Sequence, residues 1–515
     1  MKRKLTYDYL MLMMLIVNGI VFVIELFLHV DTHMKPVIIA ASLFFMVRAF
    51  YFREKVTQIK TLLALSFLGS EIVLILVPII FLPRFFGIFF RNPKVRRLQV
   101  IASLFFLYAL VMLILTNLFD FSFYTIVLWF LTFGFLPLVF VYYSSFQYNG
   151  DNSSEIFSFF ERAIQLQVVI VLIQAVVHRD FTPGDSWTGS SGNAVIVGFY
   201  FCLYLLFLFI RFIIRLDRPI SFLKIITLKN ILILGLFAVI MYFNDSKIVI
   251  MVFGIGGVLW FFFLLLSRFT SRLRPAMFVR VVMATGAITV IVAMIYVASN
   301  MYVKASLGTD QGLGALSAYT QNTLDEKGIN AKYVLYKRVY VDMLQEEPIA
   351  WMFGVGPGKF GSKTSNILAY DILYRDKTQV KLPSSIPPYS SQFTKDYMAD
   401  LWTEQIAGTT TERSAMLSMP FGGLITVKAE YGFVGMIAFM FMIFAFSYYM
   451  IKKAFAIDDW RLKDWAIALS ITWFSLPLHM IFDNYQEKAY FMLPLLTLSA
   501  VLLSVVDEKN SVPVV

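Results

Sequence analysis

Apolar runs of about twenty residues recur along almost the whole chain, and this feature limits the fold more than any other. A helix needs about 20 apolar residues to cross the hydrocarbon core of a bilayer. Hydrophobic residues make up 59% of the chain and charged residues only 15%, which leaves too little polar side chain to cover a water-soluble core. We therefore predict an all-α polytopic membrane protein with about 12 transmembrane helices. The runs are 8–28, 36–52, 61–82, 98–116, 122–143, 156–177, 193–215, 231–243, 248–266, 277–298, 422–451, 464–482 and 489–506.

Clusters of Lys and Arg beside the runs predict which connections face the cytoplasm, because positively charged loops are retained there. The segment 299–419 then faces outward as one large extracytoplasmic loop that is partly helical. It separates N-terminal transmembrane helices within 1–298 from C-terminal ones within 420–515. Both termini are expected inside, which requires an even number of spans, so one run before residue 100 is interpreted as interfacial or re-entrant. The clusters are 2–4, 53–60, 211–218, 268–274 and 452–463.

The predicted outer loop is electrically balanced, with 12 Lys and Arg residues against 12 Asp and Glu residues. The net charge of +11 therefore lies mainly in the cytoplasmic turns, where it favours contact with anionic lipid and gives no reason to expect nucleic acid. Within the loop, 333–344 has the pattern of an amphipathic helix, and the prolines of 381–388 predict irregular backbone. Cys202 is the only cysteine, so an intramolecular disulfide and a cysteine metal cluster are both excluded.

A glycine-rich stretch at 354–362 is the most distinctive motif of the outer loop. It does not match a phosphate-binding Walker loop, because Phe353 and Phe360 stand where that pattern needs Gly and Ser or Thr. The glycines permit a tight turn packed against helix ends. Alternatively, the turn lines a substrate cleft through Gly354, Gly356 and Gly358 with the adjacent Lys359.

Two ionisable residues, Lys428 and Glu430, lie near the start of the run 422–451. Charged groups at membrane depth are costly and usually face a polar cavity. A residue at the interface can instead extend its charged end to water. Both interpretations remain open from the sequence.

Five short segments in a fixed order resemble the superfamily of O-antigen ligases and O-antigen polymerases. Taken together, they cover the chain from residue 185 to residue 484, whereas the first 150 residues match in hydrophobicity alone. The segments are 185–193 (DSWTGSSGN), 245–247 (DSK), 354–360 (GVGPGKF), 430–435 (EYGFVG) and 479–484 (HMIFDN).

The resemblance implies an integral-membrane glycosyltransferase of the bacterial cytoplasmic (inner) membrane, with its large loop facing the periplasm or exterior. Its partners would be an undecaprenyl-diphosphate-linked oligosaccharide donor, a glycan or lipid-glycan acceptor, membrane lipids and a chain-length regulator. Members work without a metal or other cofactor at the site. The sequence agrees, because the outer loop lacks an Asp-Xaa-Asp motif and holds none of the four histidines.

Cations are expected to bind the diphosphate, since negative charge develops on it as the glycosidic bond breaks. Lys247 stands where the family usually has Arg after Ser, and Arg338 lies in a stretch where relatives carry Arg. Arg179 precedes the first landmark, and Arg413 precedes the return of the chain into the membrane. These four residues are the predicted diphosphate ligands.

The acceptor hydroxyl must lose a proton, which calls for a base within hydrogen-bonding distance. Many relatives carry a His nine residues before the glutamate of the fourth landmark, but Phe421 stands there in this chain. Glu404, Glu412 and Glu430 are the candidate catalytic residues, and proton loss to the diphosphate itself is the alternative.

His479 and Asp483 in the last landmark are assigned to the substrate cleft, either as a hydrogen-bonded pair or as residues of a helix end. The favoured function is a polysaccharide polymerase that transfers a glycan from undecaprenyl diphosphate onto a lipid-linked repeat unit. The alternative within the class is an O-antigen ligase that transfers the glycan to lipid A-core or another acceptor. A lipid-linked oligosaccharide flippase or transporter is the alternative outside it, although the absence of a sequence repeat disfavours it.

Overall fold

The structure is a computed structural model that describes most of the helical runs and part of the outer loop. The described residues form helices and connecting turns, with no β-strand among them, so the all-α prediction is confirmed over this part of the chain. The runs 231–243 and 277–298 lie almost entirely outside it. The described ranges are 2–28, 35–51, 54–68, 95–178, 189–191, 194–211, 247–266, 331–369, 387–401 and 422–506, with a few isolated positions between them.

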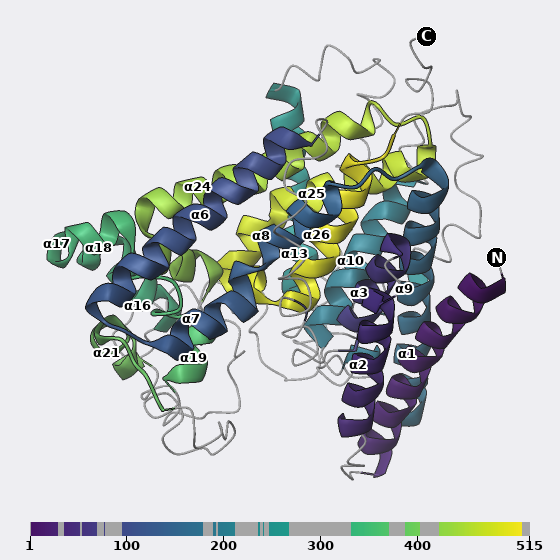
Figure 1. Cartoon of the computed structure of the whole chain (residues 1–515), viewed down its shortest axis with the longest axis horizontal. Helices are drawn as coiled ribbons and strands as arrows, with labels where there is room; N and C mark the ends of the chain where they lie inside the picture. Colours follow the sequence, from purple (N-terminus) through teal and green to yellow (C-terminus); the bar gives the residue numbers. More distant parts are fainter. Residues whose placement is uncertain are drawn as a thin grey trace, which may run out of the picture.

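The helices of the predicted membrane portion form one bundle, and the described part of the predicted outer loop is gathered at one end of two of them, α6 and α24 (Figure 1). This part, residues 331–369 and 387–401, is called the outer segment after its predicted location. Within the bundle, α25 packs against α24, α13 and α10, and α26 packs against α8 and α3. The bundle helices are α1 (Lys2–Leu28), α2 (Lys35–Tyr51), α3 (Lys55–Ser66), α6 (Arg96–Phe119), α7 (Phe123–Trp129), α8 (Leu136–Ser144), α9 (Gly150–His178), α10 (Ala194–Phe209), α13 (Lys247–Leu266), α24 (Gly423–Ala454), α25 (Trp460–Phe482) and α26 (Ala489–Leu503).

Three described helices, α6, α9 and α24, are long and apolar enough to cross a membrane. Their outward sides carry large apolar side chains, such as Leu118 with 73% of its surface exposed and Phe441 with 61%. Such side chains fit a lipid surface better than water. A helical protein with membrane spans is therefore the class that this part of the fold supports, while the total of twelve spans stays a prediction.

The run 122–143 is a broken helix, where the sequence predicted one continuous span. Helices α7 and α8 are joined through a π-helix at Phe130–Gly134 and bent by 45°, so that together they can supply a fourth span. Pro137 lies in the first turn of α8 and has no N–H to continue the helical hydrogen-bond ladder. The break therefore has a cause in the sequence that the hydrophobic pattern does not reveal.

Helix α24 contains a kink at Gly432, whose backbone adopts a φ of 69° inside an otherwise regular helix. The turns before the kink, from Ile425 onward, are buried by protein, and exposed apolar side chains begin after it at Val434. The kink leaves the carbonyl of Tyr431 free to accept a hydrogen bond of 2.7 Å from the hydroxyl of Tyr108 on α6.

The outer segment forms a second, smaller hydrophobic core against the first turns of α24. Leu335, Val339 and Met343 are buried in it at a spacing of four residues, so the predicted amphipathic helix at 333–344 is confirmed, with a π-helical turn in its middle. The elements of this segment are α16 (Ala331–Lys337), the π-helix η5 (Arg338–Asp342), α17 (Met343–Glu346), α18 (Pro348–Phe353), α19 (Lys363–Leu368) and α21 (Gln392–Tyr397).

Candidate functional site

Three of the five landmarks meet in one polar junction, which we define as residues 354–363, the first turns of α24 around Glu430, and the turn 483–488 between α25 and α26. Glu430 is fully buried at its centre. Its Oε2 accepts a hydrogen bond of 2.8 Å from the N–H of Gly358, and its Oε1 accepts one of 2.9 Å from the N–H of Phe360. The carboxylate thus holds the glycine turn against α24.

The backbone of the glycine turn also pairs with the backbone of α24. The N–H groups of Val355 and Gly356 donate to the carbonyls of Ala429 and Glu430, at 2.9 and 3.1 Å. A Cβ on Gly354, which has a φ of 94°, would lie 2.2 Å from the carbonyl oxygen of Glu430. Glycine is needed here because only it fits both the positive φ and the close approach of two backbones.

The turn between α25 and α26 contributes the third side of the junction. The amide of Asn484 donates to the carbonyl of Gly361 at 2.8 Å, and its Oδ1 accepts a hydrogen bond of 3.3 Å from the hydroxyl of Thr426. The buried carboxylate of Glu487 accepts a hydrogen bond of 2.5 Å from the N–H of Lys363. Segments more than a hundred residues apart in the sequence are therefore joined by direct hydrogen bonds.

Two ionisable side chains of the junction, Glu487 and Lys363, have pKa values that burial shifts. Burial raises the pKa of the Glu487 carboxyl, while the N–H and the ammonium group of Lys363 oppose this shift. Burial also lowers the pKa of Lys363 to about 8, with the charge of Glu487 acting against the shift and that of Lys488 adding to it. Lys363 therefore loses its proton closer to neutral pH than an ordinary lysine does.

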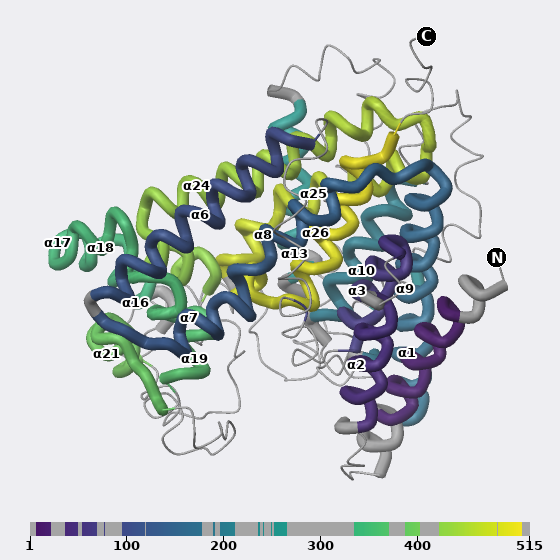
Figure 2. The backbone as a smooth tube through the Cα atoms, in the orientation of Figure 1, coloured from purple at the N-terminus to yellow at the C-terminus, as the bar shows by residue number. Residues whose placement is uncertain are grey.

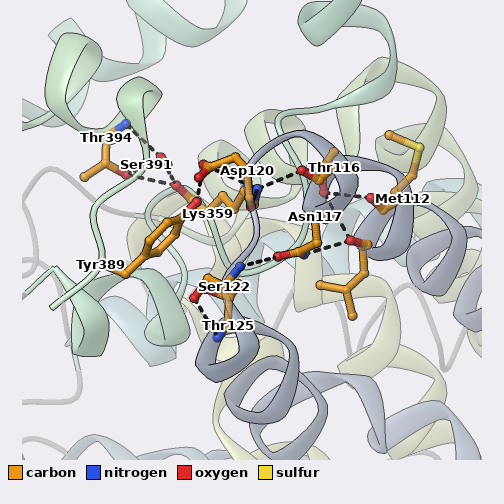
Figure 3. Close-up of polar contacts among 11 residues, drawn as sticks. Met112, Thr116, Asn117, Asp120, Ser122, Thr125, Lys359, Tyr389, Ser391 and Thr394 are labelled. Atoms are coloured by element: carbon orange, nitrogen blue, oxygen red, sulfur yellow. Dashed lines mark hydrogen bonds and ion pairs between the residues drawn. The ribbon is translucent and has the colours of Figure 1, made fainter. Parts of the chain in front are cut away.

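Lys359 fastens the glycine turn to α6, as Figure 3 shows. It is 3% exposed, and its Nζ donates to the carbonyls of Thr116 at 3.0 Å and Asp120 at 2.7 Å, where a cation is favoured at a helix C-terminus. The carboxylate of Asp120 lies 3.5 Å away and accepts a hydrogen bond from the hydroxyl of Tyr389. The ammonium group of Lys359, which the sequence assigned to a substrate cleft, therefore binds these protein groups.

The carbonyl of Lys359 is engaged as well. It accepts hydrogen bonds of 2.5 Å from the hydroxyl of Ser391 and 2.9 Å from that of Thr394, both at the start of α21 (Figure 3). The single residue Lys359 thus connects α6, the glycine turn and α21. These contacts support the interpretation of the turn as one packed against helix ends.

Arg338 is the predicted diphosphate ligand whose side chain the structure describes. It forms a bidentate pair with Asp400, with both N–O distances at 2.7 Å, and donates to the carbonyl of Tyr397 at 2.9 Å. This pair lowers the pKa of the Asp400 carboxyl below its ordinary value. Lys247 begins α13, but its side chain lies outside the described residues, as do Arg179, Arg413, Glu404 and Glu412.

His479 and Asp483 do not form the hydrogen-bonded pair that their spacing permits. Asp483 forms an ion pair with Lys488 instead. The imidazole of His479 is buried between aromatic rings that include Phe253 and Tyr485, with centroid distances of 5.0 Å to each. Neither ring nitrogen has a hydrogen-bond partner among the described residues.

Sequence reasoning missed Glu487 and Lys363, which complete the junction. Both lie in polar stretches where a charged residue is ordinary, so no pattern distinguishes them. For Lys428 the sequence permits either a polar cavity or the membrane interface, and the structure shows instead a buried side chain bound by protein. Its Nζ donates to the carbonyl of Trp351 at 2.7 Å and lies 4.1 Å from the centre of that indole ring.

The comparisons with known proteins give no family assignment: no protein-family model matches the sequence, and no curated protein is significantly similar to it. The described residues also contain no group of three or more His, Cys, Asp or Glu side chains placed to hold a metal ion. The class defined by fold and site is a helical protein with candidate membrane spans and a polar junction beside one of them.

Proposed function

We propose that the protein is an integral-membrane glycosyltransferase that polymerises a polysaccharide from undecaprenyl-diphosphate-linked repeat units at the extracytoplasmic face of the bacterial inner membrane. The observation that carries the proposal is the polar junction itself. Segments that resemble three separate family landmarks are far apart in the sequence, yet they contact one another through Glu430, Asn484 and the glycine turn. Coincidental likenesses would not be expected to converge in this way.

In the proposed reaction, a hydroxyl oxygen of the acceptor repeat unit attacks the anomeric carbon of the donor glycan. The new glycosidic bond forms as the bond to the diphosphate breaks, and undecaprenyl diphosphate leaves. The hydroxyl proton passes to a carboxylate or to the departing diphosphate. Fixed cations stabilise the leaving group, since charge develops there in the transition state.

Arg413, Lys247, Arg338 and Arg179 remain the proposed diphosphate ligands. Arg338 can serve only if the diphosphate replaces or shares its contact with Asp400, which is half exposed and therefore accessible to a competing anion. Glu404 and Glu412 are the stronger candidates for the base. Glu430 is the weaker one, because backbone N–H groups occupy both of its oxygens.

The test uses purified protein in proteoliposomes with lipid-linked repeat units as the only substrate. A ladder of longer lipid-linked glycans is the expected product. A product that forms only when a different acceptor is added would identify a ligase instead. Movement of the lipid-linked glycan across the bilayer without a new glycosidic bond would identify a flippase and overturn the proposal.

A pair of variants tests the part of Arg338. If its guanidinium binds the diphosphate, Arg338→Ala should lower turnover by about 100-fold, whereas Asp400→Ala should retain turnover because it leaves the cation in place. Equal losses of turnover in both variants would mean that Arg338 acts only by stabilising the fold through its pair with Asp400. Lys395→Ala, an exposed cation on α21, is the matched control for a change of charge.

A further inference from the structure

The short helices α17 and α18 carry an apolar face that no described residue covers. Ile349 is 77% exposed, and four other apolar residues of this region are also exposed. They lie in the segment that the sequence predicts to face water, where such a face is unfavourable. The four are Val341, Leu344, Met352 and Phe353.

Helix α18 is fixed against α24 at the kink. The indole of Trp351 stacks on Phe433 with ring centroids 5.0 Å apart and planes 14° apart. The hydroxyl of Tyr108 on α6, which donates to the nearer carbonyl of Tyr431, shares its proton with the carbonyl of Phe353 at 3.3 Å. The position of α18 along α24 is therefore defined by contacts on both neighbouring helices.

This position coincides with the beginning of the lipid-facing surface of α24. The helix is buried by protein up to Gly432, and exposed apolar side chains continue from Val434 to Phe441. On α6, the exposed apolar side chains extend to Leu118 near the helix end. Figure 2 shows α17 and α18 beside α24 and the same end of α6.

We propose that α17 and α18 lie in the membrane interface, with their apolar face in contact with lipid acyl chains. Continuity with the lipid-facing surfaces of α6 and α24 favours lipid over any other occupant. Gln345 near the end of α17 and Glu347 between the two helices are exposed and would face the headgroup layer. Because the glycine turn begins directly after Phe353, this contact places the polar junction at the membrane surface.

Site-directed spin labelling in nanodiscs tests the proposal. Labels at Ile349→Cys and Phe353→Cys are compared with labels at Phe441→Cys, on the lipid-facing side of α24, and Lys395→Cys, on exposed α21. The wild-type chain serves as background, because its one cysteine, Cys202, is buried. Collision with oxygen reports lipid, and collision with a water-soluble nickel chelate reports water.

The expected result is an oxygen-to-nickel collision ratio at both α18 sites that matches the Phe441 site and exceeds the Lys395 site. A ratio equal to that at Lys395 would overturn the proposal in favour of a water-facing surface. Spin–spin broadening at Ile349→Cys, with low access for both reagents, would overturn it in favour of a second copy of the chain. The substituted side chains are exposed, so gel filtration of each variant should match that of the wild type.

Discussion

The interior of the bundle and the attachment of the outer segment to the bundle depend on different kinds of contact. The bundle interlocks large side chains, as where Trp473 stacks on Phe446 and Trp465 on Phe207, each with centroids 4.3 Å apart. The glycine turn of the outer segment is attached to the bundle by buried polar side chains, chiefly Glu430 and Lys359. Helices satisfy their own backbone, whereas an irregular turn beside a membrane helix needs partners from elsewhere.

Removing the carboxylate of Glu430 should have the largest effect. Glu430→Ala leaves the N–H groups of Gly358 and Phe360 buried without acceptors, which should cost about 3 kcal/mol or more. Thermal unfolding in detergent and limited proteolysis of the outer segment would measure the loss. Glu347→Ala, which removes an exposed carboxylate, should change little. Equal stability of the two variants would contradict the anchoring part assigned to Glu430.

A substitution at the kink of α24 should cause the next largest loss of stability. A Cβ on Gly432 would lie 2.4 Å from the backbone nitrogen of Gly354, at a positive φ, so Gly432→Ala should destabilise the protein by about 2–3 kcal/mol. Gly257→Ala on α13 is the matched control, since no atom lies within 4 Å of its added Cβ. It should leave the melting temperature unchanged or raise it. A loss of similar size in both variants would contradict the role assigned to the kink, because helix propensity alone favours Ala over Gly at both positions.

The junction should also respond to pH through Lys363. Its pKa is lowered to about 8 in the folded protein, so between pH 8 and its ordinary value the unfolded chain binds more protons and stability rises with pH. Lys363→Met removes this contribution. Relative to the variant, the wild type should therefore gain about 1 kcal/mol between pH 8 and pH 9.5. Parallel stability curves for the two proteins across this range would contradict a lowered pKa for Lys363.

The ion pair between Arg338 and Asp400 should have the smallest effect on stability. Both side chains are partly exposed, at 23% and 50%, so water weakens the attraction between them. Asp400→Asn should cost about 0.5–1 kcal/mol at low salt and less at high salt. Denaturant titration at two ionic strengths measures this difference. A loss of stability that is the same at both ionic strengths would contradict the partial exposure of this ion pair.

The sequence predicted the features that depend on local pattern. The apolar runs located α6, α9 and α24, and a four-residue spacing located the amphipathic helix that contains Val339. It could not predict contacts that depend on the fold. Lys359 binds carbonyls at the end of α6, about 240 positions earlier in the chain, and no periodicity encodes such a pairing.

The candidate site was predictable to a similar extent. The sequence indicates that Glu430 needs partners, because a charge at that depth is costly. It does not indicate which partners, because they are backbone N–H groups, which nearly every residue has. His479 and Asp483 have a spacing that permits a pair, yet the ion pair with Lys488 competes for the carboxylate. Which partner a side chain binds therefore depends on the other residues that the fold brings near it, and the sequence spacing does not reveal them.

Hydrogen–deuterium exchange of the glycine turn, in nanodiscs and followed by mass spectrometry, tests most directly whether Glu430 holds that turn. Peptides that contain the amides of Gly358 and Phe360 should exchange slowly in the wild type. In Glu430→Ala they should exchange as quickly as exposed amides, while peptides from α26 stay protected. Rapid exchange of the turn in the wild type, or unchanged protection in the variant, would contradict the account.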